Sequence, residues 1–240
     1  GGLPSITGAS TATGKYQEAI SVNDAVYSVK PASFHNPEFL DSIDDSSTGI
    51  VYSEDGSTIV SYGAELAPAY FKVHKLIDGV WTLLSDCSSP PPTSVRSLAV
   101  SPNGTHIFYG MSSGGTGHVG DCGLIFKVTG TTITKLNAIS SLPSGSANYY
   151  YHSYAATWNH AGTNLVISIY KTWYSYNKWY YDLQLYPFVT SGDTFTLKTM
   201  LSQDRAVAGS GIALVWSPGD TYLVNINAHG YVKNKVYTFN

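Results

Sequence analysis

The fold is decided by the stretch Ala99-Val-Ser-Pro-Asn-Gly104-Thr-His-Ile-Phe108, in which a turn separates two β-rich runs. Asn and Gly tolerate the positive φ angle that a tight hairpin needs. The pattern occurs five times, although the first copy, Thr13-Gly-Lys-Tyr16, is weak. Repeats roughly 40 to 60 residues apart are typical of propeller blades and not of helical solenoids. The aligned glycine column falls at Gly14, Gly56, Gly104, Gly162 and position 220, where the order is swapped to Gly219-Asp220.

A second hairpin recurs between these copies. Ala69–Leu76 is followed by an Asp78-Gly79 turn and Val80–Leu84, and later stretches repeat the arrangement. Alternating apolar and polar residues with central turn residues indicate antiparallel strands. Each repeat is therefore expected to be a four-stranded sheet, with strands a to d joined as a–turn–b–loop–c–turn–d. The other copies run from Leu124 to Leu136, from Leu183 to Lys198 and, more loosely, through Ala25–Lys30 and Glu38–Ile43.

Radially repeated four-stranded sheets form a β-propeller. The sequence thus predicts an all-β chain that is a single propeller domain over 1–240, with five blades near 1–45, 46–89, 90–142, 143–203 and 204–240. Four blades, or a larger ring completed by another chain, remain open. The last repeat stops after a c strand, so Leu3–Thr7 or Tyr16–Ile20 could supply its fourth strand.

Composition excludes several classes of partner. Charged residues make up 12% of the 240 residues, against about 25% in an average domain. A net charge of −3 offers no field for nucleic acid, so no nucleic-acid partner is expected. No apolar run is long enough to span a membrane. The start Gly1-Gly-Leu-Pro4 lacks the features of a signal peptide, and membrane insertion is not expected.

The turn repeat resembles the WD-repeat-like propeller repeats found in phage virion structural proteins. The residues that carry the resemblance are Ser101–Thr105, Ser217–Leu223 and Ser191–Thr196. The Trp-Asp dipeptide of true WD repeats is absent, so no binding residue is carried over. The resemblance implies a scaffold or recognition role on a particle surface, in a virion or extracellular setting.

The predicted loops differ between the two faces of the propeller. The a–b and c–d turns are short, whereas the b–c and d–a connections on the other face are long. Long loops are where function tolerates or requires insertions. A binding surface is therefore expected on the long-loop face, which comprises Cys87–Ser94, Met111–Gly123, Ser140–Tyr151, Lys171–Tyr180 and Gln203–Ser210.

Aromatic residues are densest on this face. Tyr and Trp give rigid contact area with a polar handle, which suits glycan stacking or a protein contact. The alternative is that they are strand residues that pack on neighbouring blades. The candidate ligand-binding residues are Trp173, Tyr174, Tyr176, Trp179, Tyr180 and Tyr150.

The two cysteines, Cys87 and Cys122, fall in loops of adjacent blades on the long-loop face. A disulfide between them is sterically plausible, and two free thiols are the alternative. Neither cysteine has the spacing of a metal or redox site. A disulfide would indicate an oxidising or extracellular setting.

Catalytic motifs are absent from the sequence. It contains no HExxH, GxSxG or phosphate-binding glycine loop, and no cofactor or metal is expected. His106 and His160 lie at a–b turns and are expected to be solvated. The leading hypothesis is a non-enzymatic structural or recognition module that binds protein subunits of an assembly or surface glycans. The alternatives are a carbohydrate-binding lectin and, with less support, a propeller hydrolase.

Overall fold

The structure is a computed structural model that divides into two compact units, Gly1–Asp45 and Ser46–Asn240. It describes residues 19–22, 25–28, 49–63, 70–84, 95–113, 122–136, 142, 149–175, 178–205, 212–227 and 234–239.

In the first unit, β1 (Ala19–Val22) pairs antiparallel with β2 (Ala25–Ser28). The expected strand at Ala25–Lys30 is therefore present in part, but the strand that pairs with it is β1. The weak turn copy at Gly14 and the expected strand at Glu38–Ile43 lie outside the described residues.

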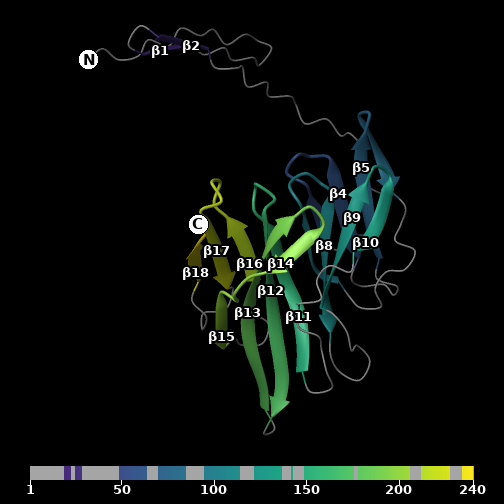
Figure 1. The fold of residues 1–240 in the computed structure, drawn as a ribbon, viewed down its shortest axis with the longest axis vertical. Helices are drawn as coiled ribbons and strands as arrows, with labels where there is room; N and C mark the ends of the chain where they lie inside the picture. The colour runs from purple at the N-terminus through teal and green to yellow at the C-terminus, as the bar shows by residue number, and fades with distance from the viewer. Residues whose placement is uncertain are drawn as a thin grey trace. The chain divides into compact units, whose positions relative to one another are not determined.

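The second unit consists of antiparallel sheets in sequence order (Figure 1). The first sheet contains β3 (Gly49–Tyr52), β4 (Thr58–Gly63), β5 (Tyr70–Ile77) and β6 (Val80–Leu84). The second contains β7 (Val95–Val100), β8 (His106–Ser113), β9 (Gly123–Thr129) and β10 (Thr132–Leu136). The third contains β11 (Tyr149–Trp158), β12 (Asn164–Ser175), β13 (Lys178–Ser191) and β14 (Thr194–Leu197), and β15 (Ser202–Arg205) also pairs with β13. A short pairing of β8 with β11, at Ser113 with Tyr151 and Ser112 with His152, makes the second and third sheets continuous. The fourth contains β16 (Ile212–Trp216), β17 (Tyr222–Asn227) and β18 (Lys235–Thr238).

The first strands of successive sheets lie next to one another, in the order β3, β7, β11 and β16. The sheets therefore pack face against face, as propeller blades do. Strand β8 shows the pattern most clearly, because Ile107 and Tyr109 face the first sheet while Phe108 faces the third. A strand buried on both faces reads as a continuous apolar run. The predicted all-β propeller fold is confirmed, while the count of five blades and the single-domain boundaries stay predictions.

Three apolar clusters fill the spaces between the sheets. Burying one such side chain contributes about 1.5–3 kcal/mol. The cluster between the first and second sheets includes Val60, Val73, Leu84, Val95, Leu98 and Ile107. The cluster between the second and third includes Phe108, Ile125, Trp158, Leu165, Ile167, Phe188 and Phe195. The cluster between the third and fourth includes Val166, Leu185, Leu214, Trp216 and Leu223.

The four described a–b turns share one hydrogen-bond pattern. The first residue of each turn accepts a hydrogen bond, through its side chain, from the backbone N–H five residues later. The donor–acceptor pairs are Thr58 to Ser53 (2.9 Å), His106 to Ser101 (2.9 Å), Asn164 to Asn159 (2.7 Å) and Tyr222 to Ser217 (3.0 Å). The residue in the glycine column has a positive φ angle in all four turns, and Asp220, at φ 56°, takes the place of glycine as the sequence alignment predicts.

Four predicted loops are wrong in part. In the predicted loop Met111–Gly123, residues 111–113 belong to β8 and Gly123 begins β9. Lys171–Tyr180 is a strand hairpin, because β12 continues to Ser175 and β13 begins at Lys178. Tyr149–Tyr151 belongs to β11, and residues 203–205 belong to β15. The aromatic and β-branched residues of Tyr149–Tyr151 and Lys171–Tyr180 favour strands, whereas residues 203–205 contain none and become a strand by pairing with β13.

Candidate functional site

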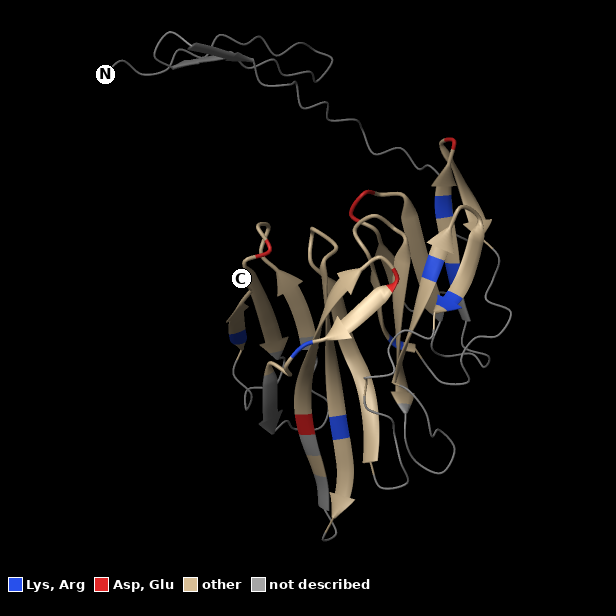
Figure 2. Cartoon of the chain, in the orientation of Figure 1, with Lys and Arg blue, Asp and Glu red and all other residues tan. Residues whose placement is uncertain are grey.

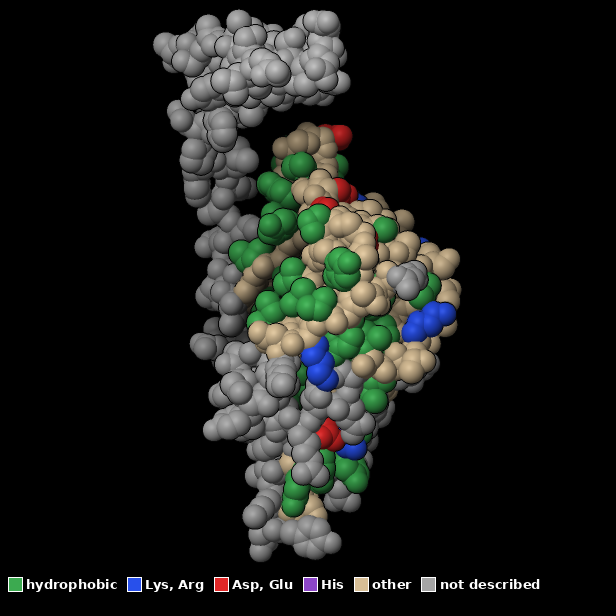
Figure 3. All heavy atoms as spheres, turned by 90° about the vertical axis from the view of Figure 1, so that its left-hand side faces the viewer, with side chains coloured by type: hydrophobic (Ala, Val, Ile, Leu, Met, Phe, Trp, Pro, Cys, Tyr) green, Lys and Arg blue, Asp and Glu red, His purple; other side chains and the backbone are tan. Residues whose placement is uncertain are grey.

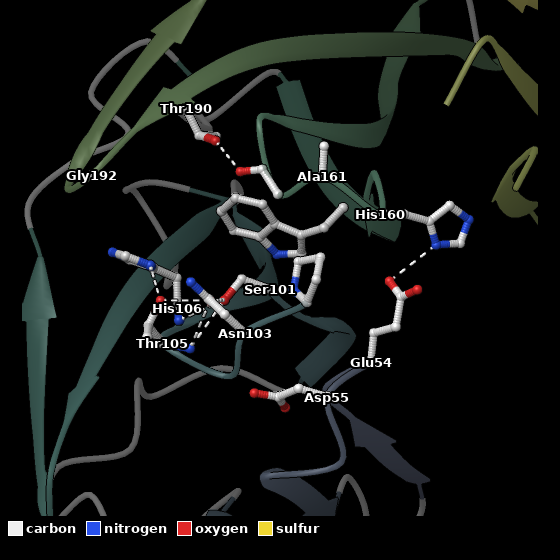
Figure 4. Close-up of a pocket in the computed structure, with 13 residues that line it drawn as sticks. Glu54, Asp55, Ser101, Asn103, Thr105, His106, His160, Ala161, Thr190 and Gly192 are labelled. Atoms are coloured by element: carbon white, nitrogen blue, oxygen red, sulfur yellow. Dashed lines mark hydrogen bonds and ion pairs between the residues drawn. The ribbon is translucent and has the colours of Figure 1, made fainter. Parts of the chain in front are cut away.

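The a–b turns of the first three sheets surround a pocket of about 480 Å³ (Figure 4). We call this end of the second unit the turn face. It is opposite to the face on which the sequence predicts binding. The pocket is lined by Glu54, Asp55, Ser101, Pro102, Asn103, Thr105, His106, Trp158, His160, Ala161, Gly162, Thr190 and Gly192.

Hydrogen bonds join the first a–b turn to the second and the third to the fourth. The Asp55 N–H donates to the Pro102 carbonyl at 3.0 Å, which links the first and second sheets. The Asp220 carboxylate accepts from the N–H groups of His160 at 2.9 Å and Ala161 at 2.8 Å, which links the fourth and third sheets. Since these bonds fix one turn against another, the pocket wall is held by backbone groups.

His106 joins the second and third sheets. Its Nε2 lies 3.0 Å from a carboxylate oxygen of Asp193, and the Lys127 ammonium donates to the other oxygen at 2.6 Å. Its side chain is only 12% exposed and lies in ring contact with Trp158 and Phe195. The prediction that His106 is solvated is therefore wrong, because the ring enters the contact between two sheets. The hydrogen bonds from Lys127 and then His106 lower the pKa of Asp193.

His160 lies on the surface, as predicted, with 41% of its side chain exposed. Its Nδ1 lies 3.0 Å from Glu54 Oε2, so the pair connects the third sheet to the first (Figure 4). The hydrogen bond with Glu54 raises the pKa of His160, and the charges of Glu54 and Asp220 add to this effect.

We expect the NMR titration midpoint of His160 to lie above 6.5, and Glu54→Gln to move it back toward that value. The carboxylate favours the charged imidazolium, whereas an amide does not. Because the folded-state pKa is raised, the stabilisation from this pair is complete below pH 6.5 and is lost as the pH rises through the folded-state pKa. An unchanged midpoint in Glu54→Gln would exclude the pair in solution.

The candidate aromatic residues lie on the longest strands of the structure. We call the ends of β11, β12 and β13, at Tyr149–Tyr151, Lys171–Ser175 and Lys178–Asp182, the aromatic arm. β12 has 12 residues and β13 has 14, whereas the strands of the other sheets have 4 to 8. The ends of these two strands extend away from the turns of the third sheet (Figure 1).

Strand register sorts the arm residues onto two faces. Tyr149, Trp173 and Tyr180 lie side by side across the three strands, and the rings of Trp173 and Tyr180 stack at 5.4 Å. In the next row on that face, the Lys171 ammonium lies 4.6 Å from the ring centre of Tyr149 and 5.4 Å from that of Trp173. These contacts are cation–π interactions.

The remaining predicted site residues fall elsewhere. Tyr150 and Tyr174 occupy the alternate positions of β11 and β12 and so lie on the opposite face of the arm, where Tyr174 is 55% exposed. Tyr176 and the side chain of Trp179 lie outside the described residues. Cys122 is buried, and Cys87 lies outside the described residues, so the predicted disulfide stays a prediction.

A third surface is the outer face of the fourth sheet. Figure 3 shows hydrophobic side chains gathered on the side of the second unit that carries β16 to β18. Val215 is 50% exposed and Val236 is 65% exposed, and the two lie in one row with Val224.

No group of three or more His, Cys, Asp or Glu side chains suited to a metal ion occurs in the described part of the chain. Those residues likewise include no helix with the length and hydropathy needed to cross a membrane.

The comparison with known proteins supplies no family. No protein-family model matches the chain, and no curated protein matches it. It is similar to a solved protein from Lactobacillus plantarum, at 15% identity over 95% of this chain and 62% of that one, with a TM-score of 0.49. It is also similar to a chain of a nidogen/laminin complex, at 14% identity over 94% of this chain and 71% of that one, with a TM-score of 0.47. The third match is TolB from Acinetobacter baumannii, at 10% identity over 92% of this chain and 45% of that one, with a TM-score of 0.40. The chain thus spans less than two thirds of the length of the first of these proteins. The strand order described above defines the fold.

The sequence patterns missed two features of the turn face. One is the polar residue at the start of each a–b turn, which could have been found because Ser53, Ser101, Asn159 and Ser217 lie at one position of the repeat. The other is the link of Asp193 to Lys127 and His106, which carries no sequence signal because Asp193 belongs to the third sheet, whereas His106 and Lys127 are paired neighbours on β8 and β9 of the second.

Proposed function

We propose that this chain is a non-enzymatic recognition module that binds other protein subunits of a larger assembly through its aromatic arm. A phage-like virion or another extracellular assembly is the proposed setting, on the basis of the turn repeat alone.

The observation that carries this proposal is the exposure of large aromatic side chains on an extended strand pair. Tyr174 is 55% exposed and Tyr149 is 41% exposed, on opposite faces of the arm. Tyr and Trp are enriched at protein interfaces because they bring a large rigid surface and a polar group. Tyr149 and Tyr174 lie on hydrogen-bonded strands, β11 and β12, so little ordering entropy is lost on binding.

The state of Trp173 favours a protein ligand over a sugar. Stacking on a sugar requires an accessible ring face, but the Trp173 ring already stacks on Tyr180 and has the Lys171 ammonium 5.4 Å from its centre. Lys171 also lies over Tyr149. The Trp173 face of the arm is therefore already packed by its own side chains, and Tyr174 on the other face is the anchor that we propose for the partner.

We expect Tyr174→Ser to abolish or weaken, by about tenfold or more, the retention of the chain in its native assembly, because interface aromatics contribute about 2 kcal/mol or more each. The measurement is co-elution of the tagged chain with the assembly on size exclusion. Tyr52→Ser is the matched control, since Tyr52 is 73% exposed on β3, away from the arm.

Equal retention of both variants would contradict the arm as the contact surface. A glycan array separates the lectin alternative: binding to a defined glycan that Tyr174→Ser removes would replace the protein partner with a sugar.

A further inference from the structure

We propose that the turn-face pocket binds an arginine or lysine side chain from a basic peptide segment of a partner protein. This inference deepens the proposed recognition function, on which it rests for the existence of a partner, and concerns a surface separate from the aromatic arm.

Acidic side chains are concentrated at this end of the second unit (Figure 2). Of the acidic residues whose side chains the structure describes in the second unit, all except Asp182 lie in turns of the turn face. The lysines and the arginine with described side chains lie on strands or at a strand end. The turn residues are Glu54, Asp55, Asp78, Asp193 and Asp220. Lys127 neutralises Asp193 within this group, but acidic side chains still outnumber lysines in these turns, and an excess of one sign attracts a partner of the opposite sign and raises its association rate.

Two of these carboxylates, those of Glu54 and Asp55, line the pocket, and they differ in whether an oxygen is available to accept a hydrogen bond from a ligand. Asp55 is occupied within its own turn, where its oxygens accept from the Ser53 hydroxyl at 2.6 Å and from the N–H and hydroxyl of Ser57 at 2.9 and 3.0 Å. Glu54 interacts with His160 through Oε2 only, and its Oε1 has no partner in the described part of the chain. Glu54 Oε1 is therefore the acceptor available to a cation, and Asp55 adds charge beside it.

One lining residue, Trp158, carries a buried donor that has no acceptor among the described residues. Trp158 lines the pocket, is only 8% exposed, and its indole Nε1–H has no hydrogen-bond partner among the described residues. A buried polar group without a partner is rare and raises the free energy of the state in which it occurs. A peptide carbonyl is an acceptor of the kind that this donor lacks, whereas a metal ion or a simple amine offers none.

The lining favours an organic cation over a metal ion. No cluster of metal ligands exists in the described residues, and the Asp55 oxygens are already hydrogen-bonded. The volume of about 480 Å³ lies in the range of pockets that hold organic ligands. Guanidinium and ammonium groups keep their attraction to carboxylates and to aromatic rings in such a site.

The test uses a fluorescein-labelled tetra-arginine peptide, acetylated and amidated at its ends, with fluorescence anisotropy at low salt. We expect the wild-type chain to bind the peptide and Glu54→Gln to weaken binding about tenfold, since a charged hydrogen bond is worth about 1.5 kcal/mol or more. Gln keeps a side chain of the same size that can still bond to His160, so the turn is preserved.

Asp78→Asn is the matched control, because Asp78 is an acidic residue of the turn face that does not line the pocket and has the positive φ of 50° that Asn tolerates. We expect its affinity to stay within about twofold of wild type. Equal losses of peptide affinity in the two variants would mean that the general negative charge of the turn face, and not the pocket, attracts the peptide, and would overturn the proposal. Unchanged affinity in Glu54→Gln, or no binding of the peptide to the wild-type chain, would overturn it as well.

Spermine serves as the second probe, since a free polyamine shares the cationic chemistry. If spermine competes at the same concentration as the peptide and depends equally on Glu54, the site is one for small polyamines and the peptide proposal is wrong. Weak competition supports the peptide. Because this assay needs no natural partner, its failure leaves the aromatic arm untouched, and failure of the arm variants leaves the pocket untouched.

Discussion

Phe188→Ala is expected to lower the free energy of unfolding by about 3–5 kcal/mol, as removal of a fully buried ring does. Phe188 is 0% exposed in β13 and belongs to the cluster between the second and third sheets, with Leu165, Ile167 and Trp158. Its loss leaves a cavity where the sheets pack against each other, because strands held by hydrogen bonds on both sides relax little. Urea denaturation followed by tryptophan fluorescence measures the change.

Val189→Ala is the control for this result. Val189 is the next residue of β13, lies on the other face and is 38% exposed. We expect it to lower stability by less than about 1 kcal/mol. Similar losses in both variants would mean that this part of β13 does not have one buried and one open face, and would contradict the sheet packing described above.

Gly104→Ala is expected to lower stability by about 3 kcal/mol, from two separable causes. The residue has a φ of 66°, which costs about 1–2 kcal/mol for a residue with a Cβ atom. That Cβ would also lie 2.7 Å from the Ser57 hydroxyl and 3.0 Å from the Thr58 Cβ of the neighbouring sheet. Overpacking of this kind adds about 1–3 kcal/mol.

Gly56→Ala separates the two causes. Gly56 has nearly the same φ, 70°, but no atom within 4 Å of the position of its Cβ. We expect it to show the backbone cost alone, about 1 kcal/mol, in the same urea denaturation. If the two alanine variants are equally stable, the first and second a–b turns do not touch as the structure shows.

Much of the fold follows from local residue patterns. The turn repeat places Gly56, Gly104 and Gly162 at positive φ and identifies Asp220 as their equivalent, because turn sterics depend on neighbouring residues in the chain. The Asp78-Gly79 turn between β5 and β6 is predicted for the same reason, since both residues take positive φ angles there.

The candidate sites depend on contacts that a local pattern does not contain. Glu54 meets His160, and Asp193 meets His106, only after three sheets are assembled. The aromatic arm was found in sequence as a dense group of Tyr and Trp, but its division into two faces required the strand register of Trp173 with Tyr180. The sequence does not predict the pocket on the turn face, because short turns carry no local signal of a cavity and it is the close approach of three of them that creates it.

The measurement that tests the recognition function most directly is the native mass of the protein as isolated from its source, without denaturant. Burial of the exposed aromatic arm in a partner predicts a discrete complex heavier than the chain's own 25.8 kDa, or recovery within a larger particle. A homogeneous monomer of 25.8 kDa, isolated under those conditions, would contradict the proposal that this chain serves as an assembly module.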